Sequence, residues 1–242
     1  MPSESDANNR GPNLPAELER DYLAFKSELD RLVQSGVACA ALQNLLASPK
    51  TLDHLIQFAL LLYRQSRQLA LVARGDLPRL FTRHILDSLN PVSIFPRHPA
   101  SILDIGSGSG LPGIPLALVW PYSRVILLES REKKAGFLER AVRELELRNV
   151  RVVCARLEDA ASSWSEPLVE AVVIRAVGRL PDLLREASRV AAPCAIWVYF
   201  LGTAERAGPL IDSIDAGAFG PTAGCGALGG WLLTGRFAPS GR

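Results

Sequence analysis

The sequence predicts an α/β fold built on a doubly wound, mostly parallel sheet. From residue 102 onward, apolar segments typical of strands alternate with amphipathic helical segments, and a glycine-rich turn follows the first strand. Such alternation places helices on both faces of a parallel sheet, and ligands bind such sheets at the carboxyl ends of the strands. The chain has 242 residues, 48% of them hydrophobic, enough for one core with a helical extension.

The chain before the expected sheet consists of a polar N-terminal segment and two segments with helical periodicity. Residues 1–15 are polar and rich in Pro and Asn, which predicts a disordered tail. Residues 18–46 and 51–73 show helical periodicity and are separated by a proline. We therefore expect an N-terminal helical extension over residues 16–90, capping a sheet domain over residues 91–242.

Five strands and their helices follow in order. A stripe of apolar side chains over residues 137–145 predicts a helix that ends before Asn149, and another helix is expected over residues 181–190. Residues 216–242 are rich in glycine, which weakens any prediction of strands there. The expected strands are residues 102–105, 125–128, 150–153, 168–174 and 195–200.

The glycine-rich turn can be parsed in two ways. Residues 108–113 match the dinucleotide fingerprint GxGxxG. Residues 104–110 instead match the loop Asp-x-Gly-x-Gly-x-Gly of S-adenosylmethionine-dependent methyltransferases. We favour the second parsing because Gly106 follows the strand directly, whereas Pro112 and Pro115 remove backbone donors that a pyrophosphate would need.

Two charged residues at strand ends are candidates for ligand binding. Glu129 ends an apolar run, at the spacing where nucleotide-binding folds place an acid against ribose hydroxyls. The alternative is that Glu129 begins a solvated loop. Arg175 follows a strand expected to be buried, so its guanidinium needs a ligand or an internal ion pair.

Four motifs together resemble one known family. The longest is residues 104–116, which contain Pro112-Gly113-Ile114-Pro115, a run that few other families share. The others are Arg83-His84-Ile85-Leu86-Asp87-Ser88-Leu89, Leu127-Leu128-Glu129-Ser130 with Lys133, and Arg175-Ala176. Over residues 55–200 the chain thus resembles the small-subunit (16S) ribosomal RNA guanine-N7 methyltransferases, also called glucose-inhibited division protein B.

The resemblance implies a Rossmann-like methyltransferase that uses S-adenosylmethionine and acts on ribosomal RNA or the small ribosomal subunit. It assigns no catalytic acid or base, because guanine N7 has a lone pair and no proton to lose, so that alignment suffices. Glu158 could equally be a helix N-terminal charge, and His84 a packing residue. The cofactor residues that the resemblance implies are Gly106, Leu111, Leu157, Glu158 and Arg175, to which the glycine loop adds Gly108 and the strand spacing adds Glu129. The expected RNA contacts are Arg83, His84 and Lys133.

The chain departs from the family pattern mainly where RNA would bind. Leu201 stands where the fifth strand of the family usually ends in lysine, before Gly202. An Asn-Leu-Thr run is replaced by Gln68-Leu69-Ala70, and residues 229–234 replace a basic strand. The cofactor half of the expected site is therefore intact, whereas the RNA half is eroded.

Charge leaves other functions open. The net charge of +2 is small for a protein that binds RNA, although residues 54–85 carry five arginines against Asp76 alone. A solvated helix face would explain those arginines as well. The alternatives are a methyltransferase with a small-molecule or other acceptor, a nicotinamide-dependent dehydrogenase, and a binding protein with a vestigial cofactor site.

Composition bears on location and metals. The four cysteines, at positions 39, 154, 194 and 225, lack the spacing of a metal site. The sequence shows neither a signal peptide nor a run of about 18 apolar residues. We therefore expect a cytoplasmic, monomeric protein without a metal ion and without membrane contact.

Overall fold

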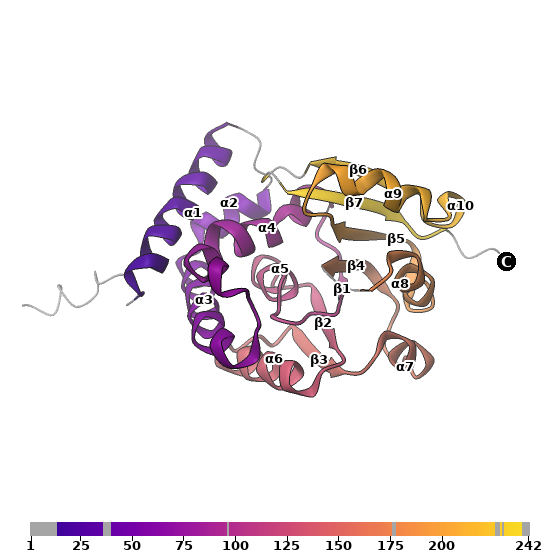
Figure 1. The fold of residues 1–242 in the computed structure, drawn as a ribbon, viewed down its shortest axis with the longest axis horizontal. Coiled ribbons are helices and arrows are strands. Elements are labelled where there is room, and N and C mark those ends of the chain that lie inside the picture. Colours follow the sequence, from indigo (N-terminus) through magenta and orange to yellow (C-terminus); the bar gives the residue numbers. More distant parts are fainter. Residues whose placement is uncertain are drawn as a thin grey trace, which may run out of the picture.

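A seven-stranded sheet forms the centre of the protein (Figure 1). The computed structural model describes residues 14–35, 40–95, 97–175, 178–225, 228 and 230–238. The strands are β1 (Ser101–Ile105), β2 (Arg124–Glu129), β3 (Val150–Cys154), β4 (Val169–Arg175), β5 (Ala191–Phe200), β6 (Thr222–Cys225) and β7 (Trp231–Arg236), in the order β3-β2-β1-β4-β5-β7-β6. The pairings among β1–β5 are parallel, and β7 runs antiparallel to β5 and β6. The expected mostly parallel sheet is thereby confirmed.

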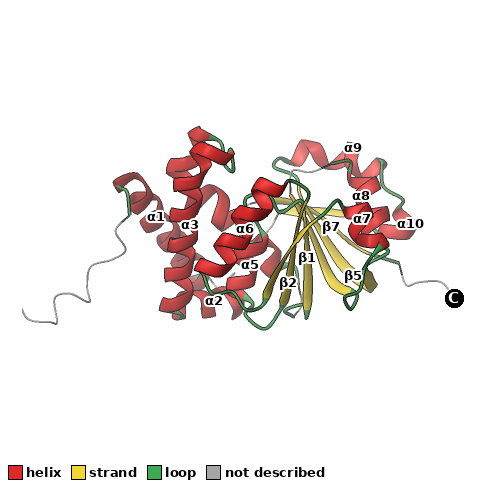
Figure 2. Cartoon of the chain, turned by 90° about the horizontal axis from the view of Figure 1, so that it is seen from below, coloured by secondary structure: helices red, strands yellow, loops and turns green. Residues whose placement is uncertain are grey.

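Helices cover both faces of the sheet, as a doubly wound fold requires (Figure 2). Residues along β1 alternate between two apolar layers: Ile102 packs in one, and Leu103 and Ile105 pack in the other. The first layer contains α5 (Gly113–Val119) and α6 (Glu132–Glu144), and the second contains α7 (Leu157–Ser162) and α8 (Leu180–Ala187). Because both faces are covered, every residue of β1 is buried.

The N-terminal helices pack outside α5 and α6, so they extend the first apolar layer (Figure 2). They are α1 (Ala16–Gln34), α2 (Ala40–Ala47) and α3 (Pro49–Leu69). The single helix expected over residues 18–46 is therefore wrong, because α1 and α2 are separate. α3 begins at Pro49, where the Ser48 hydroxyl caps the Thr51 N–H at 3.3 Å, and ends before Ala70, which is left-handed. Residues 1–13 of the expected disordered tail lie outside the described residues.

A series of short helical turns connects α3 to β1. They are η2 (Arg74–Arg79), the π-helical η3 (Leu80–Ile85), α4 (Leu86–Ser88) and η4 (Asn90–Ser93). Asp21 of α1 holds η3 in place, since its buried carboxylate accepts the Phe81 N–H at 2.6 Å and the Thr82 hydroxyl at 2.5 Å. α1 therefore fixes the segment that carries Arg83 and His84.

The C-terminal region forms two strands despite its glycine content, beyond η5 (Ala204–Arg206), α9 (Ala207–Asp212) and α10 (Ala216–Phe219). A Cβ atom on Gly235 would approach Trp197 and the Phe219 carbonyl closer than 3.0 Å. Glycine is required in β7 because other elements pack directly against its backbone. The composition of residues 216–242 had left the presence of strands there open, and the structure shows β6 and β7.

One expected boundary is confirmed and another changes. α6 ends at Glu144, before Asn149 as expected, and the Asn149 side-chain amide donates to the Ala117 carbonyl at 3.0 Å. β5 starts at Ala191, earlier than the expected strand, and the β4–β5 register shifts between Val169 and Ala171. Within the described residues, every helix falls short of the length and apolarity needed to span a bilayer.

Candidate functional site

The expected ligand residues meet at the carboxyl ends of β1, β2 and β4. Ile105 of β1 pairs with Leu128 of β2 on one side and with Ile174 of β4 on the other. The next residue of each strand therefore lies in one row, which brings together Glu129, Gly106 and Arg175. Chain order reverses between β1 and β4, and open parallel sheets bind their ligands at such a switch point.

The glycine-rich turn lies at the centre of this row, and its backbone carries no side chain at three positions. Gly106, Gly108 and Gly110 have φ values of 68°, 54° and 83°, a region that side chains with a Cβ rarely adopt. The Gly106 N–H still donates to the Leu128 carbonyl at 2.8 Å, so the turn starts in register with β2. All three glycines belong to the motif that the sequence analysis singled out.

Asp104 ties the far side of the turn to β1. Its Oδ2 accepts the Gly113 N–H at 3.1 Å, and its Oδ1 is buried without a hydrogen-bond partner among the described residues. Burial raises the pKa of the Asp104 carboxyl to about 7. A Cβ on Gly113 would approach Asp104 and Leu127 closer than 3.0 Å, so glycine is needed for this contact.

Glu129 is buried against the turn, with 6% of its surface exposed. Its Oε2 accepts the Gly108 N–H at 2.9 Å, and its Oε1 accepts the Arg131 N–H at 2.8 Å. The carboxylate therefore does not belong to a solvated loop. Each oxygen keeps further acceptor capacity, as binding a ribose diol requires.

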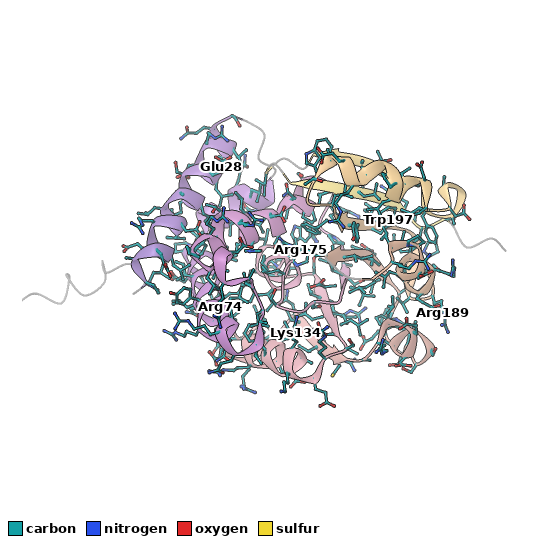
Figure 3. All side chains as sticks on the ribbon, in the orientation of Figure 1. Glu28, Arg74, Lys134, Arg175, Arg189 and Trp197 are labelled. Carbon is teal, nitrogen blue, oxygen red and sulfur yellow. The ribbon has the colours of Figure 1, made fainter. Side chains whose placement is uncertain are left out.

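Arg175 takes part in an ion pair at the end of β4. Its Nη2 lies 2.9 Å from Asp87 Oδ2, and its Nη1 donates to the Ser88 hydroxyl at 3.1 Å. The guanidinium carbon lies 5.3 Å from the centre of the Phe200 ring. The internal ion pair left open by the sequence is thus present. Arg175 lies between the N-terminal helices and the C-terminal strands (Figure 3).

Arg83 and His84 share Asp76 as a partner. The His84 Nε2 is 3.5 Å from Asp76 Oδ2, and the Arg83 Nε is 3.2 Å from Asp76 Oδ1. Burial and, to a smaller extent, the neighbouring Arg175 charge together lower the pKa of His84 to about 4. His84 is therefore neutral near pH 7, and of the three expected RNA contacts it is the one that the structure places beside Arg175.

The remaining expected residues occupy different environments. Leu111 and Leu157 are buried, with 6% of each exposed. Glu158 is exposed in the first turn of α7, where it also suits the alternative of a helix N-terminal charge. Lys133 is exposed on α6. The roles of these four residues in binding stay predictions.

Two cations near the row were missed by the sequence analysis. The Lys134 Nζ lies 3.8 Å from the position a Cβ on Gly108 would occupy, and Glu129 Oε2 lies at the same distance (Figure 3). Arg206 Nη1 donates to the Leu201 carbonyl at 3.1 Å, which returns a positive charge to the end of β5. The only sequence signal was closeness along the chain, of Lys134 to Glu129 and of Arg206 to Leu201.

Two other features of the described residues were considered as candidate sites: a cavity and possible metal-binding groups. A cavity of about 600 Å³, lined by α2 and residues 118–122, lies at the amino ends of the strands, away from the row. The described residues contain no group of three or more His, Cys, Asp or Glu side chains that could hold a metal ion. The glycine turn and the charged row are therefore the best candidate site.

Comparison with known proteins identifies relatives of this chain. A family model described as rRNA small subunit methyltransferase G matches residues 51–207. A protein named ribosomal RNA small subunit methyltransferase G from Hydrogenovibrio crunogenus is 39% identical over 144 residues, and one of the same name from Novosphingobium aromaticivorans is 38% identical over 154. These matches cover 59% and 63% of this chain and 64% of each relative, so the chain matches under two thirds of each relative's length.

A solved structure shares the fold. A putative O-methyltransferase from Klebsiella pneumoniae superposes with a TM-score of 0.55 at 14% identity, covering 90% of this chain and 99% of the other. At this identity the likeness concerns the fold alone.

Proposed function

Since the chain belongs to the rRNA small subunit methyltransferase G family, we propose that it transfers the methyl group of S-adenosylmethionine to guanine N7 in small-subunit (16S) ribosomal RNA. The observation that carries the proposal is the row of Glu129, Gly106 and Arg175 at the switch point between β1 and β4. The family match includes all three residues.

The geometry of the turn supports cofactor binding. A ligand can approach the backbone at Gly108, because the space that a Cβ would fill lies between Glu129 and Lys134. In the proposal the ribose diol donates to Glu129, and Leu157 packs against the adenine while Glu158 accepts from its amino group. Gly106 and Leu111 present backbone groups, and Arg175 lies at the opposite end of the row. The unpartnered Asp104 Oδ1 is a further polar atom near the turn.

The chemistry requires alignment rather than proton transfer. S-adenosylmethionine would supply an electrophilic methyl group on a sulfonium. Guanine N7 would attack it with a lone pair in the plane of the base, and the sulfur–methyl bond would break, so that S-adenosylhomocysteine leaves with the electron pair. No proton leaves N7, so the protein needs no general base there. The neutral, mostly buried His84 beside Arg175 is consistent with a site that orients its ligands.

Contact with RNA would come from two cations and from the neutral His84. We place Arg83, His84 and Lys133 in this role, with His84 acting through its neighbours because its side chain is 16% exposed. Arg206 supplies a charge at the end of β5, where the family's lysine is missing. In the proposal Arg83, Lys133 and Arg206 supply positive charge locally, although the net charge of the chain is only +2.

Calorimetric titration with S-adenosylhomocysteine, beside NADH, is the first test. It is followed by transfer of labelled methyl groups to small ribosomal subunits and to naked 16S rRNA, with digestion to nucleosides. We expect S-adenosylhomocysteine to bind and the label to appear as 7-methylguanosine. Binding of NADH alone would overturn the assignment from the turn onward.

A second candidate is a methyltransferase of the same fold with another acceptor. Leu201 in place of lysine and the small net charge favour it. Binding of S-adenosylhomocysteine without label in either RNA substrate would select this candidate.

A further inference from the structure

Hydrogen bonds and one ion pair connect the C-terminal segment to Arg175. The Leu228 N–H donates to Asn90 Oδ1 at 3.0 Å, and Asn90 Nδ2 donates to Asp87 Oδ1 at 3.1 Å. The other carboxylate oxygen, Asp87 Oδ2, lies 2.9 Å from Arg175 Nη2. Asn90 is fully buried. Its single amide therefore links the backbone at Leu228 to the carboxylate that pairs with Arg175.

Gly230 packs directly on the same two side chains. A Cβ atom at this position would approach Asp87 Oδ1 and Asn90 Nδ2 closer than 3.0 Å. Neither atom can move freely, because Asn90 is bonded on both sides and Asp87 faces Arg175. The backbone at Gly230 thus limits how far Asp87 and Asn90 can shift.

The two carboxylate oxygens of Asp87 have different partners, and this arrangement determines where the Arg175 guanidinium lies. Asn90 holds Oδ1, which sets the rotation of the carboxylate and aims Oδ2 at Arg175. The Ser88 hydroxyl, itself donating to the His84 carbonyl at 2.6 Å, accepts from Arg175 Nη1. A planar guanidinium held at two nitrogens has one orientation, with Phe200 beside it.

We propose that Leu228 and Gly230 act with Asn90 and Asp87 as positioning residues that hold Arg175 in the orientation needed for cofactor binding. The inference rests on the proposed function, in which Arg175 lines the cofactor site. It gives the C-terminal segment a role in the site although that segment follows β4 by more than fifty residues in the chain.

The test compares two glycine variants that differ in the space available to a Cβ. Gly230→Ala forces a methyl group against Asp87 and Asn90, whereas Gly224→Ala in β6 meets nothing within 4 Å. Loss of an outer residue that orients a ligand-binding group costs about tenfold or more in affinity at metal sites, so we expect Gly230→Ala to bind S-adenosylhomocysteine about tenfold more weakly. Gly224→Ala should bind like the unaltered protein.

The same titrations in an Arg175→Ala background show whether the effect passes through Arg175. We expect Gly230→Ala to cause no further loss of affinity there. Asn90→Asp is the second variant, because it keeps the side-chain volume and the acceptor for the Leu228 N–H but removes the donor to Asp87. It should weaken S-adenosylhomocysteine binding as Gly230→Ala does. This variant keeps the inference testable if Gly230→Ala does not fold.

The outcomes that contradict the positioning of Arg175 differ from those that contradict the proposed function. Unchanged affinity in both folded variants overturns the inference, as does a loss that persists in the Arg175→Ala background. If the unaltered protein does not bind S-adenosylhomocysteine, the proposed function fails. The positioning of Arg175 is then judged from unfolding free energies: a non-additive cycle between Asn90→Asp and Arg175→Ala supports it, and additive values overturn it.

Discussion

The Glu129 carboxylate accepts the Gly108 N–H at 2.9 Å, which joins the end of β2 to the middle of the glycine turn. This bond holds Gly108 in its left-handed conformation and places a buried acid beside the most open part of the turn. Under the proposed function, one carboxylate both shapes the turn and binds the ribose.

Replacing Glu129 with alanine should therefore weaken S-adenosylhomocysteine binding strongly. A hydrogen bond to a charged group contributes about 1.5–3 kcal/mol, which corresponds to about ten- to a hundredfold in affinity. Calorimetry measures this, with Glu139→Ala as the control because Glu139 is exposed on α6. Equal affinities for the Glu129→Ala variant and the unaltered protein would remove Glu129 from the site.

Arg175→Ala should lower both cofactor affinity and stability. It leaves Asp87 without its counter-charge in a largely buried position, which we expect to cost about 2–3 kcal/mol in unfolding free energy. Arg189→Ala is the matched control, since Arg189 pairs with Glu186 on the surface and should change stability by less than about 0.5 kcal/mol (Figure 3). Denaturant unfolding and calorimetry measure the two effects. A folded Arg175→Ala variant with unchanged affinity would exclude Arg175 as a cofactor contact.

Two glycine-to-alanine changes should shift stability in opposite directions. Gly113→Ala drives a methyl group into Asp104 and Leu127, and overpacking of this kind costs about 1–3 kcal/mol. Gly136→Ala, on the exposed face of α6 with nothing within 4 Å, should stabilise the helix by up to about 1 kcal/mol. Thermal unfolding of the two variants tests this, and a stable Gly113→Ala variant would mean that the Asp104 contact is loose.

Asp104 and His84 should give stability opposite dependences on pH. The raised pKa of Asp104 means that the folded state binds more protons than the unfolded state between about pH 4 and 7, so this group lowers stability as pH rises through that window. The lowered pKa of His84 means that the folded state binds fewer protons between about pH 4 and 6.5, so this group lowers stability as pH falls.

The two effects oppose each other in the unaltered protein, and single variants should separate them. In Asp104→Asn, stability should increase more steeply with pH between 4.5 and 6.5, by up to about 1.4 kcal/mol per pH unit. In His84→Gln, stability should decrease with pH over the same range. Urea unfolding at several pH values measures both slopes. Slopes equal to that of the unaltered protein would show that neither group titrates in this range.

Much of the fold was predictable because its signals are local. Strand β2 was expected over residues 125–128 and occupies Arg124–Glu129, since a buried parallel strand needs a continuous apolar run. The glycine turn was predictable because its signal is also local: the positive φ values at Gly106, Gly108 and Gly110 favour glycine whatever packs around them. The break between α1 and α2 was missed, because packing as well as periodicity decides where a helix ends.

By itself the sequence determined the α/β class, the turn and the positions of Glu129 and Arg175 at strand ends, because hydrophobic periodicity and glycine spacing act over a few residues. Only the tertiary structure decided that Arg175 pairs with Asp87, that Lys134 lies near Gly108, and that the glycine-rich C-terminal region forms β6 and β7. These features depend on contacts between elements packed together in space, and such contacts exist only once the sheet and its covering helices have assembled.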